Sequence, residues 1–334
     1  MFPERTDIRL ALPSKGRIAD DTLNFLAEAG LRVYKPNPRQ LTAAMPSMPG
    51  LTVLFQRAGD IAVSVRDGSV DFGITSWDLV CERRGDHDGL LPLHRALGFS
   101  GCTLNVIVPQ GWDHIHTMAD LLAWRTDLGR PLRVATKFHN LTAAFLAQHS
   151  LGDSQLIDAE GTLEIAPLIG YADLIADLVS TGTTLRDNQM RTIDDGLILE
   201  SQACLVANRR TLRTRPEVKA MAKLLLEYVE AHLRAAGALS IFANLRGESP
   251  EAVAARMFTQ SVIGGLQGPT ISPIITREGG GWYGVHIIVR RDQLTQAIAE
   301  LRAVGGSGVV VTPVTYIFEE EPAAYRAMLA ALED

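Results

Sequence analysis

The sequence is poor in cysteine and contains no long apolar run. Its three cysteines, Cys81, Cys102 and Cys204, are odd in number and widely spaced, and none forms a Cys-x-x-Cys pair. This spacing predicts neither a disulfide framework nor a zinc knuckle. No stretch reaches the ~18 consecutive apolar residues that a membrane-spanning helix needs, and the first residues lack the apolar segment of a signal peptide. We therefore expect a soluble, cytoplasmic protein.

Basic clusters are missing as well. The formal net charge is −6 and charged residues make up 21% of the chain, so a nucleic-acid partner is not expected. Hydrophobic residues make up 46% of the 334 positions. That is more than one small domain can bury, and it predicts two or three units with separate cores.

Apolar strand-like runs alternate with stretches of helical periodicity, which is the pattern of an α/β protein. We expect two α/β lobes, joined by crossings near Val108 and Gly196 and hinged around a cleft. The first lobe would comprise residues 1–108 and 190–212, and the second residues 109–189. After residue 213 the order β-α-β-β-α-β predicts a ferredoxin-like α+β domain over residues 213–334.

The most informative segment is Asp177–Leu185, with the sequence Asp-Leu-Val-Ser-Thr-Gly-Thr-Thr-Leu. An apolar run leads into a loop rich in hydroxyl groups, and a glycine at its centre lets the backbone fold round an anion. Converging N–H and O–H donors suit a phosphate dianion. The alternative is an ordinary polar turn after a buried strand. The candidate phosphate ligands are Ser180, Thr181, Gly182, Thr183 and Thr184.

Two carboxylates, Asp173 and Asp177, precede this loop. If the segment is helical, the four-residue spacing puts both on one face. Carboxylates beside a phosphate loop suit sugar hydroxyls or a divalent cation, so the combination predicts a ribose-phosphate site. The alternative, that one of the two is a solvated helix residue, stays open, mainly for Asp173.

Four stretches together link the chain to a known family: Leu12–Arg17, Asp71–Ile74, Gly101–Cys102, and Glu164–Pro167 followed by Asp177–Leu185. On these the chain resembles ATP phosphoribosyltransferase of histidine biosynthesis, in its long form with a C-terminal regulatory domain. The resemblance implies two lobes like those of periplasmic binding proteins and a ferredoxin-like third domain. It also implies transfer of phosphoribosyl from phosphoribosyl pyrophosphate to N1 of ATP with release of pyrophosphate, Mg²⁺ as cofactor, feedback inhibition by histidine, and a homo-oligomer from dimer to hexamer.

Such a reaction needs no strong general base, because N1 of adenine already carries a lone pair. We therefore expect a site of positioning groups without a catalytic triad. The resemblance implies that Asp173, Asp177 and the loop bind phosphoribosyl pyrophosphate. Mg²⁺ would be held through the substrates, with Asp177 or Glu164 as possible protein ligands. The residues implied for the nucleotide or pyrophosphate are Lys15, Gly16, Arg17, Arg57, Asp71 and Glu164.

Each nucleotide residue has a structural alternative. Lys15–Arg17 could be an exposed basic turn, Arg57 could form a surface ion pair with Asp60, Asp71 could cap a strand end, and Glu164 could be structural. Gly98 stands where some family members carry an Asp, so one ATP contact is either absent or supplied elsewhere. The implied histidine effector residues are Leu266, Thr270, Ile288 and Gly308.

Three further features complete the sequence-based predictions. His114 and His116 could share one face of a strand, but no third metal ligand is visible. His286 is expected to be packed or next to the effector, and the segment Arg83–Gly89 to be a long surface loop. Two other functions compete with the one above: a non-catalytic phosphosugar sensor, and a phosphoribosyltransferase acting on another base.

Overall fold

The computed structural model describes residues 6–37, 39–85, 88–159, 161, 163–277 and 280–333. Clustering of contacts divides the chain into two units. The first unit runs through Leu224 and takes up the chain again from Ala323, and the second unit is Leu225–Pro322. Within the described residues no helix is both long and apolar enough to cross a bilayer.

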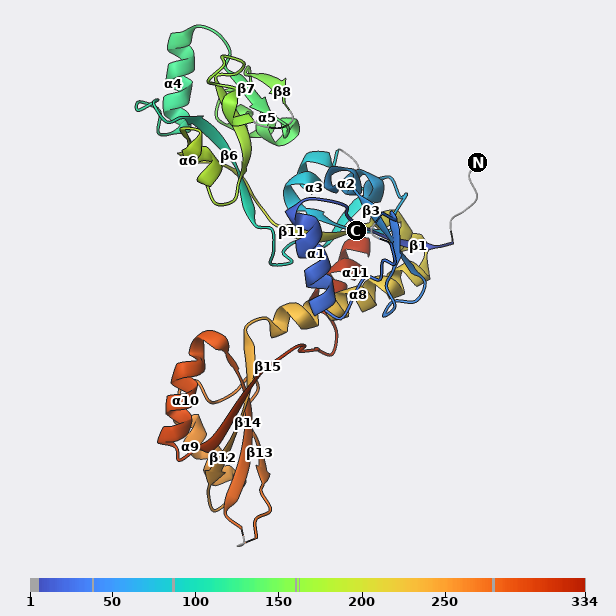
Figure 1. Cartoon of the computed structure of the whole chain (residues 1–334), viewed down its shortest axis with the longest axis vertical. Coiled ribbons are helices and arrows are strands. Elements are labelled where there is room, and N and C mark those ends of the chain that lie inside the picture. Colours follow the sequence, from blue (N-terminus) through green and yellow to red (C-terminus); the bar gives the residue numbers. More distant parts are fainter. Residues whose placement is uncertain are drawn as a thin grey trace. The chain divides into compact units, whose positions relative to one another are not determined.

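The first unit contains two sheets, which define two lobes (Figure 1). The first lobe has a six-stranded sheet in the order β2-β3-β1-β4-β11-β5. Its central strands are parallel and are buried on both faces, which is why they read as continuous apolar runs. The strands are β1 (Ile8–Pro13), β2 (Thr42–Ala44), β3 (Leu51–Gln56), β4 (Phe72–Ser76), β5 (Leu90–His94) and β11 (Ala203–Asn208), with helices α1 (Arg17–Glu28), α2 (Ala58–Arg66) and α3 (Trp77–Arg83).

The second lobe has a five-stranded sheet in the order β10-β6-β9-β7-β8. Helix α4 begins with a capping box between Thr117 and Asp120 and ends at Gly129, which adopts φ +65°. The elements are β6 (Cys102–Pro109), α4 (Met118–Leu128), β7 (Arg133–Thr136), α5 (His139–Gln148), β8 (Gln155–Asp158), the 3₁₀ turn η1 (Leu163–Ile165), β9 (Leu174–Val179), α6 (Thr183–Asp187) and β10 (Met190–Ser201).

The predicted positions of the lobe crossings are wrong. β6 and β10 pair with each other and belong to the second lobe, so the chain crosses between Leu97 and Gly101 and again at Gln202. Residues 102–108 and 190–201 therefore move from the first lobe to the second. Apolar periodicity identifies a strand but not its partner, and it is the partner that decides which sheet a strand joins.

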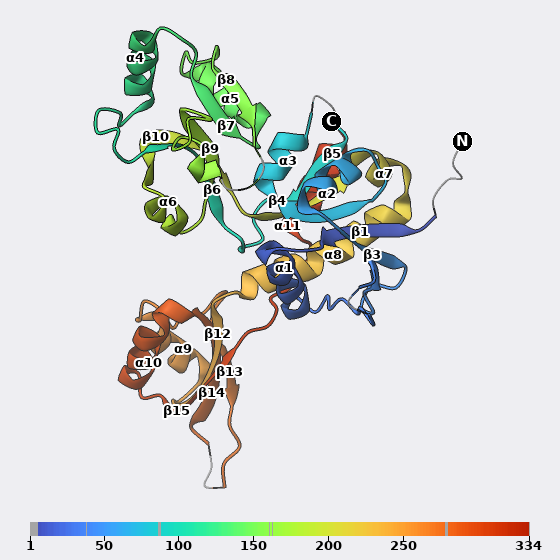
Figure 2. The same ribbon diagram turned by 45° about the horizontal axis from the view of Figure 1, so that its top comes forward.

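The second unit confirms the order β-α-β-β-α-β, in a four-stranded sheet ordered β13-β14-β12-β15. One face of this sheet is covered by α9 and α10, and strand β12 alternates accordingly, with Leu239 and Ile241 buried and Phe242 exposed (Figure 2). The elements are β12 (Ala238–Arg246), α9 (Pro250–Phe258), β13 (Thr270–Pro273), β14 (Trp282–Arg290), η2 (Arg291–Gln293), α10 (Leu294–Ala303) and β15 (Ser307–Pro313).

The predicted boundaries of the third domain, 213–334, also differ from the structure. Helix α7 (Arg209–Thr214) and the start of α8 (Pro216–Ala235) belong to the first unit. So does the C-terminal helix α11 (Ala323–Glu333), which packs on α7 and β5. Buried Met328 anchors α11. The side chains of Arg209 and Arg213 donate to its last carbonyls.

Candidate active site

The predicted phosphate loop follows the carboxyl end of β9 in the second lobe. Gly182 adopts φ +70° immediately before α6, and a Cβ built on it would meet no atom within 4 Å. The positive φ explains why glycine is needed there, because other residues rarely adopt it. The flanking hydroxyl residues, Ser180, Thr181, Thr183 and Thr184, are exposed, so their hydroxyls are available to a ligand.

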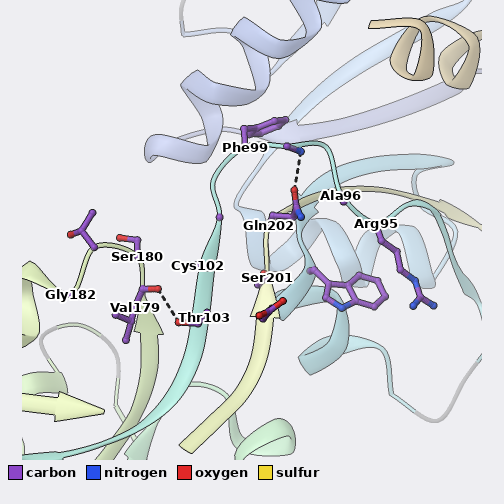
Figure 3. A pocket seen from close by; sticks show the side chains of 15 residues that line it. Arg95, Ala96, Phe99, Cys102, Thr103, Val179, Ser180, Gly182, Ser201 and Gln202 are labelled. Carbon is purple, nitrogen blue, oxygen red and sulfur yellow. Dashed lines mark hydrogen bonds between the residues drawn. The ribbon is translucent and has the colours of Figure 1, made fainter. Parts of the chain in front are cut away.

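This loop lines a cavity of about 790 Å³, a size that suits a nucleotide-sized ligand. The rest of the lining comes from the segments that cross between the lobes, from the adjoining ends of β6, β9 and β10, and from the start of α3 (Figure 3). The cavity therefore lies where a hinge motion would change its width. Its lining residues are Trp77, Arg95, Ala96, Gly98, Phe99, Gly101, Cys102, Thr103, Val179, Ser180, Thr181, Gly182, Glu200, Ser201 and Gln202.

Asp177 lies in β9 just before the loop, and its side chain is 15% exposed. The Lys137 ammonium lies 3.6 Å from its Oδ1, and the N–H of Leu178 donates to the same oxygen at 2.8 Å. Burial raises the pKa of the Asp177 carboxyl above its usual range; Lys137 opposes this rise and the nearby Glu164 carboxylate adds to it. The site thus holds two neighbouring carboxyl groups, Asp177 and Glu164, and one cationic side chain, Lys137.

The sequence interpretation missed Lys137. This residue follows β7, which runs parallel to β9 and beside it, so the two strands end at the same edge of the sheet. In open α/β sheets ligands bind at the carboxyl ends of the strands. A search for charged residues just after each predicted parallel strand would have found it.

The residues around Asp177 fit a magnesium ion only in part. The described residues contain no cluster of three or more histidine, cysteine or acidic side chains. Mg²⁺ is commonly bound by one or two carboxylates together with substrate phosphates. Asp177 and Glu164 can supply that number of carboxylates, so the protein side of the site fits an ion carried mainly by its substrates.

Asp173 does not join this site, and the segment from Leu174 to Val179 is a strand rather than a helix. The Asp173 carboxylate sits just before β9 and accepts from Arg130 Nη1 at 2.7 Å and from Arg133 Nη2 at 2.8 Å. These bonds outweigh burial, which by itself would raise the pKa of Asp173, and hold that pKa well below its usual range. Four residues along an extended strand put roughly 13 Å between Asp173 and Asp177. The role of Asp173 is therefore to fasten the amino end of β9.

Lys15 and Gly16 lie in the turn between β1 and α1, and Arg17 is the first residue of α1. Gly16 adopts φ +81° at the N-cap position. Arg17 is 78% exposed, and its Nε lies 3.5 Å from Asp21. Asp21 also accepts from the hydroxyl of Ser100 at 2.7 Å, which ties this turn to the crossing segment.

Arg57 is exposed at the carboxyl end of β3, the parallel neighbour of β1. The turns after β1 and β3 therefore share one sheet edge. The described lining of the cavity does not include the predicted residues of either turn.

The structure corrects the predicted role of Asp71 in binding the nucleotide or pyrophosphate. Its carboxylate is fully buried just before β4, where it accepts from the N–H of Arg9 at 2.9 Å and lies 3.4 Å from Arg215 Nη1. Arg9 is near the start of β1, so Asp71 lies at the amino end of the parallel strands, opposite the turn that holds Lys15. Its role at the strand end is structural, and it does not contact a nucleotide at the carboxyl edge.

The lining residues that were not predicted from the sequence include Trp77, Arg95 and Gln202. The Arg95 guanidinium lies 4.9 Å from the ring centroid of Trp77. The N–H of Gly98 donates to Oε1 of Gln202 at 2.9 Å, which joins the two crossing segments. No local pattern marks these residues, because contacts between distant segments bring them together. β11 pairs with both β4 and β5, which end beside Trp77 and Arg95, and the two crossing segments meet at Gly98 and Gln202.

Three of the four implied effector residues meet in the second unit. Leu266, Thr270 and Ile288 line a cavity of about 170 Å³ together with His286. The His286 ring stacks on Phe242 at 4.3 Å between centroids. Gly308 is on β15, at the opposite edge of the sheet from β13, and is not in the described lining.

The two remaining sequence features differ from expectation or are only partly described. His114 and His116 lie in the loop between β6 and α4, so they do not share a strand face. The segment Arg83–Gly89 begins at the end of α3, and its residues 86 and 87 lie outside the described part of the chain.

Comparison with known proteins identifies the family. The family model described as HisG, ATP phosphoribosyltransferase, matches residues 57–230, and that described as HisG, C-terminal domain, matches residues 233–316. ATP phosphoribosyltransferase 2, chloroplastic, of Arabidopsis thaliana is 42% identical, with 98% of this chain and 81% of the relative covered. ATP phosphoribosyltransferase of Rhodopseudomonas palustris (strain HaA2) is 33% identical, with 97% of this chain and 98% of the relative covered.

A solved structure agrees at the level of the fold. The ATP phosphoribosyl transferase (HisG:HisZ) complex from Thermotoga maritima contains a chain with a TM-score of 0.52 and 22% identity, covering 67% of this chain and 98% of that one. The two-lobed fold, the phosphate loop beside Asp177 and the two family models agree with one another. The chain therefore belongs to the HisG family of ATP phosphoribosyltransferases, in the long form with a C-terminal domain.

Proposed function

We propose that the loop from Ser180 to Thr184 holds the 5′-phosphate of phosphoribosyl pyrophosphate while N1 of ATP attacks C1 of the ribose. As an ATP phosphoribosyltransferase, a pentosyltransferase, the chain carries out the first step of histidine biosynthesis. The observation that carries the assignment of the loop is its position: Ser180, Thr181 and Gly182 line the 790 Å³ cavity between the lobes, just after β9 and Asp177.

In this mechanism the protein acts by positioning. Asp177 accepts hydrogen bonds from the ribose hydroxyls, and Lys137 holds its carboxylate in place from 3.6 Å. The exposed cations Lys15 and Arg17 bind pyrophosphate or the nucleotide at the amino end of α1, where the helix dipole favours anions. Holding N1 in line with C1 can supply roughly 7–11 kcal/mol of the barrier. Mg²⁺, bound by substrate oxygens and by Asp177 or Glu164, would neutralise the leaving pyrophosphate.

Histidine inhibition, self-association and a cytoplasmic location complete the proposal. The cavity beside His286, lined by Thr270 and Ile288, supports binding of a small amino acid in the second unit. Exposed Phe242 and Val310 are paired neighbours on the open face of its sheet, which supports assembly into dimers or hexamers. Free cysteines fit a reducing compartment, and the two plant relatives are named as chloroplastic proteins.

The deciding experiment measures pyrophosphate release with phosphoribosyl pyrophosphate and Mg²⁺. ATP, GTP and free adenine are compared as acceptors, each with and without histidine. We expect release with ATP far faster than with GTP or free adenine, and we expect histidine to suppress it. Pyrophosphate release with GTP or free adenine but not with ATP would show that the enzyme uses a different acceptor. Ligand binding without release from any acceptor would show a sensor protein.

A further inference from the structure

We propose that the carboxamide of Gln202 binds the N6/N7 edge of the acceptor purine and thereby selects adenine over guanine. This inference rests on the proposed phosphoribosyl transfer and adds a specificity-determining residue to it. Gln202 is half-buried and lines the same cavity as the phosphate loop, on a different segment of the chain (Figure 3).

The backbone of Gln202 is held firmly. Gln202 is the single residue between β10 and β11, and its carbonyl accepts from the N–H of Trp77 at 2.9 Å. The preceding residue, Ser201, is buried and donates its hydroxyl to Asp78 Oδ1 at 2.5 Å, while the N–H of Asp78 donates back to that hydroxyl at 2.9 Å. The starting point of the Gln202 side chain is thus fixed by two contacts to α3.

The end of the side chain is fixed as well. The N–H of Gly98 donates to Oε1 at 2.9 Å, and since only oxygen can accept this bond, the carboxamide has one orientation. Gly98 adopts φ +82°, which favours glycine at this position. Oε1 keeps a second lone pair. Within the described part of the chain, no protein group accepts from Nε2, so both atoms can bind a ligand in the cavity.

A carboxamide held in this orientation is complementary to adenine in its hydrogen bonds. It pairs in bidentate fashion with adenine, accepting from the N6 amino group and donating to N7. Guanine presents two acceptors, O6 and N7, on the same edge, so Oε1, itself an acceptor, would face the acceptor O6. Binding at this edge also leaves adenine N1 free on the adjoining Watson–Crick edge, where the reaction needs it. The same contact therefore selects the base and exposes its nucleophile.

Arg95 offers an internal contrast. Its guanidinium lies over Trp77 in the lining of the same cavity, and its charge would attract the triphosphate of any nucleotide. Removal of Arg95 should weaken the binding of ATP and of GTP equally, whereas removal of the Gln202 amide should weaken the binding of ATP alone. The two variants thus separate recognition of charge from recognition of the base.

The experiment measures kcat/KM for ATP and for GTP by pyrophosphate release, using the full chain with Mg²⁺ and saturating phosphoribosyl pyrophosphate. For Gln202→Met, which keeps the length but not the hydrogen bonds, we expect a loss of roughly 5- to 150-fold with ATP and little change with GTP. For Arg95→Gln we expect losses with both nucleotides and an unchanged ATP/GTP ratio. The KM for phosphoribosyl pyrophosphate should not change in Gln202→Met.

A folded Gln202→Met that keeps the wild-type ATP/GTP ratio would overturn the inference, and so would a wild-type chain that uses GTP as well as ATP. A wild-type chain that releases no pyrophosphate from ATP would instead overturn the proposed function. If Gln202→Met melts early, Gln202→Glu provides the second variant. It retains the acceptor for Gly98 and for N6 but loses the donor to N7, so kcat/KM with ATP should fall while ATP stays the preferred base. An unchanged kcat/KM with ATP would overturn the inference.

Discussion

Glu82 in the first lobe caps a helix of the second. Its Oε1 accepts from the N–H of Asn140 at 3.0 Å and its Oε2 from the N–H of Leu141 at 3.0 Å, in the first turn of α5. Asn140 returns a bond through its Nδ2 to the Glu82 carbonyl. Phe138, at the N-cap position, has no side-chain oxygen to do this. The lobes are thus joined three residues from Lys137, the partner of Asp177.

Glu82→Ala removes this cap and leaves two N–H groups without their acceptor. We expect it to lower the free energy of unfolding by about 1–2 kcal/mol and to raise the KM for phosphoribosyl pyrophosphate several-fold, because Lys137 loses its support. Chemical denaturation and steady-state kinetics measure the two effects. Asp113→Ala removes an exposed acid of the second lobe and serves as control. Equal behaviour of both variants would show that the cap is unimportant.

Gly182→Val tests the phosphate loop. A β-branched residue at φ +70° is strained and would close the backbone concavity, so turnover should fall below detection. Gly129→Val is a matched control, since Gly129 adopts φ +65°, also has open space around its Cβ, and lies away from the cavity. Both variants should melt at similar temperatures, whereas only Gly182→Val should lose pyrophosphate release. Substantial turnover in Gly182→Val would contradict the loop assignment.

Asp177→Asn should make the protein more stable and less active. Because burial raises the pKa of Asp177, the native state binds its proton more tightly than the unfolded chain, and stability falls as pH rises through the interval between the ordinary carboxyl pKa and the native one. Above that interval the ionised Asp177 destabilises the fold by its full amount. The asparagine variant, which carries no charge there, should therefore melt at a higher temperature than the wild type at pH 7. The advantage should vanish as pH falls toward ~4. Turnover should drop roughly 10- to 150-fold.

Asp173→Asn should show the opposite dependence on pH. Hydrogen bonds from Arg130 and Arg133 hold the native pKa low despite burial, so the carboxylate stabilises the fold above its unfolded pKa of about 4, and this contribution is lost as pH falls through the native pKa. At pH 7 the variant should be about 2 kcal/mol less stable, and the deficit should shrink below pH 4. Its kcat/KM should stay near wild type. A large fall in kcat/KM of the folded variant would show that Asp173 belongs to the substrate site after all.

These two acids also show where sequence reasoning works and where it stops. The fold class and the loop at Gly182 were predictable because they depend on local composition and periodicity. Asp173 and Asp71 were misassigned because nothing local shows that Arg130, Arg133 and Arg215 pair with them. Lys137 and Gln202 were missed for the same reason, since parallel pairing and strand crossing bring distant segments together.

The C-terminal helix provides the last test. Met328 of α11 is 2% exposed, so Met328→Ala should lower the free energy of unfolding of the first unit by roughly 2–3 kcal/mol, whereas the exposed Glu333→Ala should have no effect. A chain that ends at Arg215 loses both α11 and the buried start of α8, and we expect it to aggregate. Histidine sensitivity is therefore better tested with Thr270→Val in the intact chain. Wild-type melting of Met328→Ala would show that α11 does not dock on the first lobe.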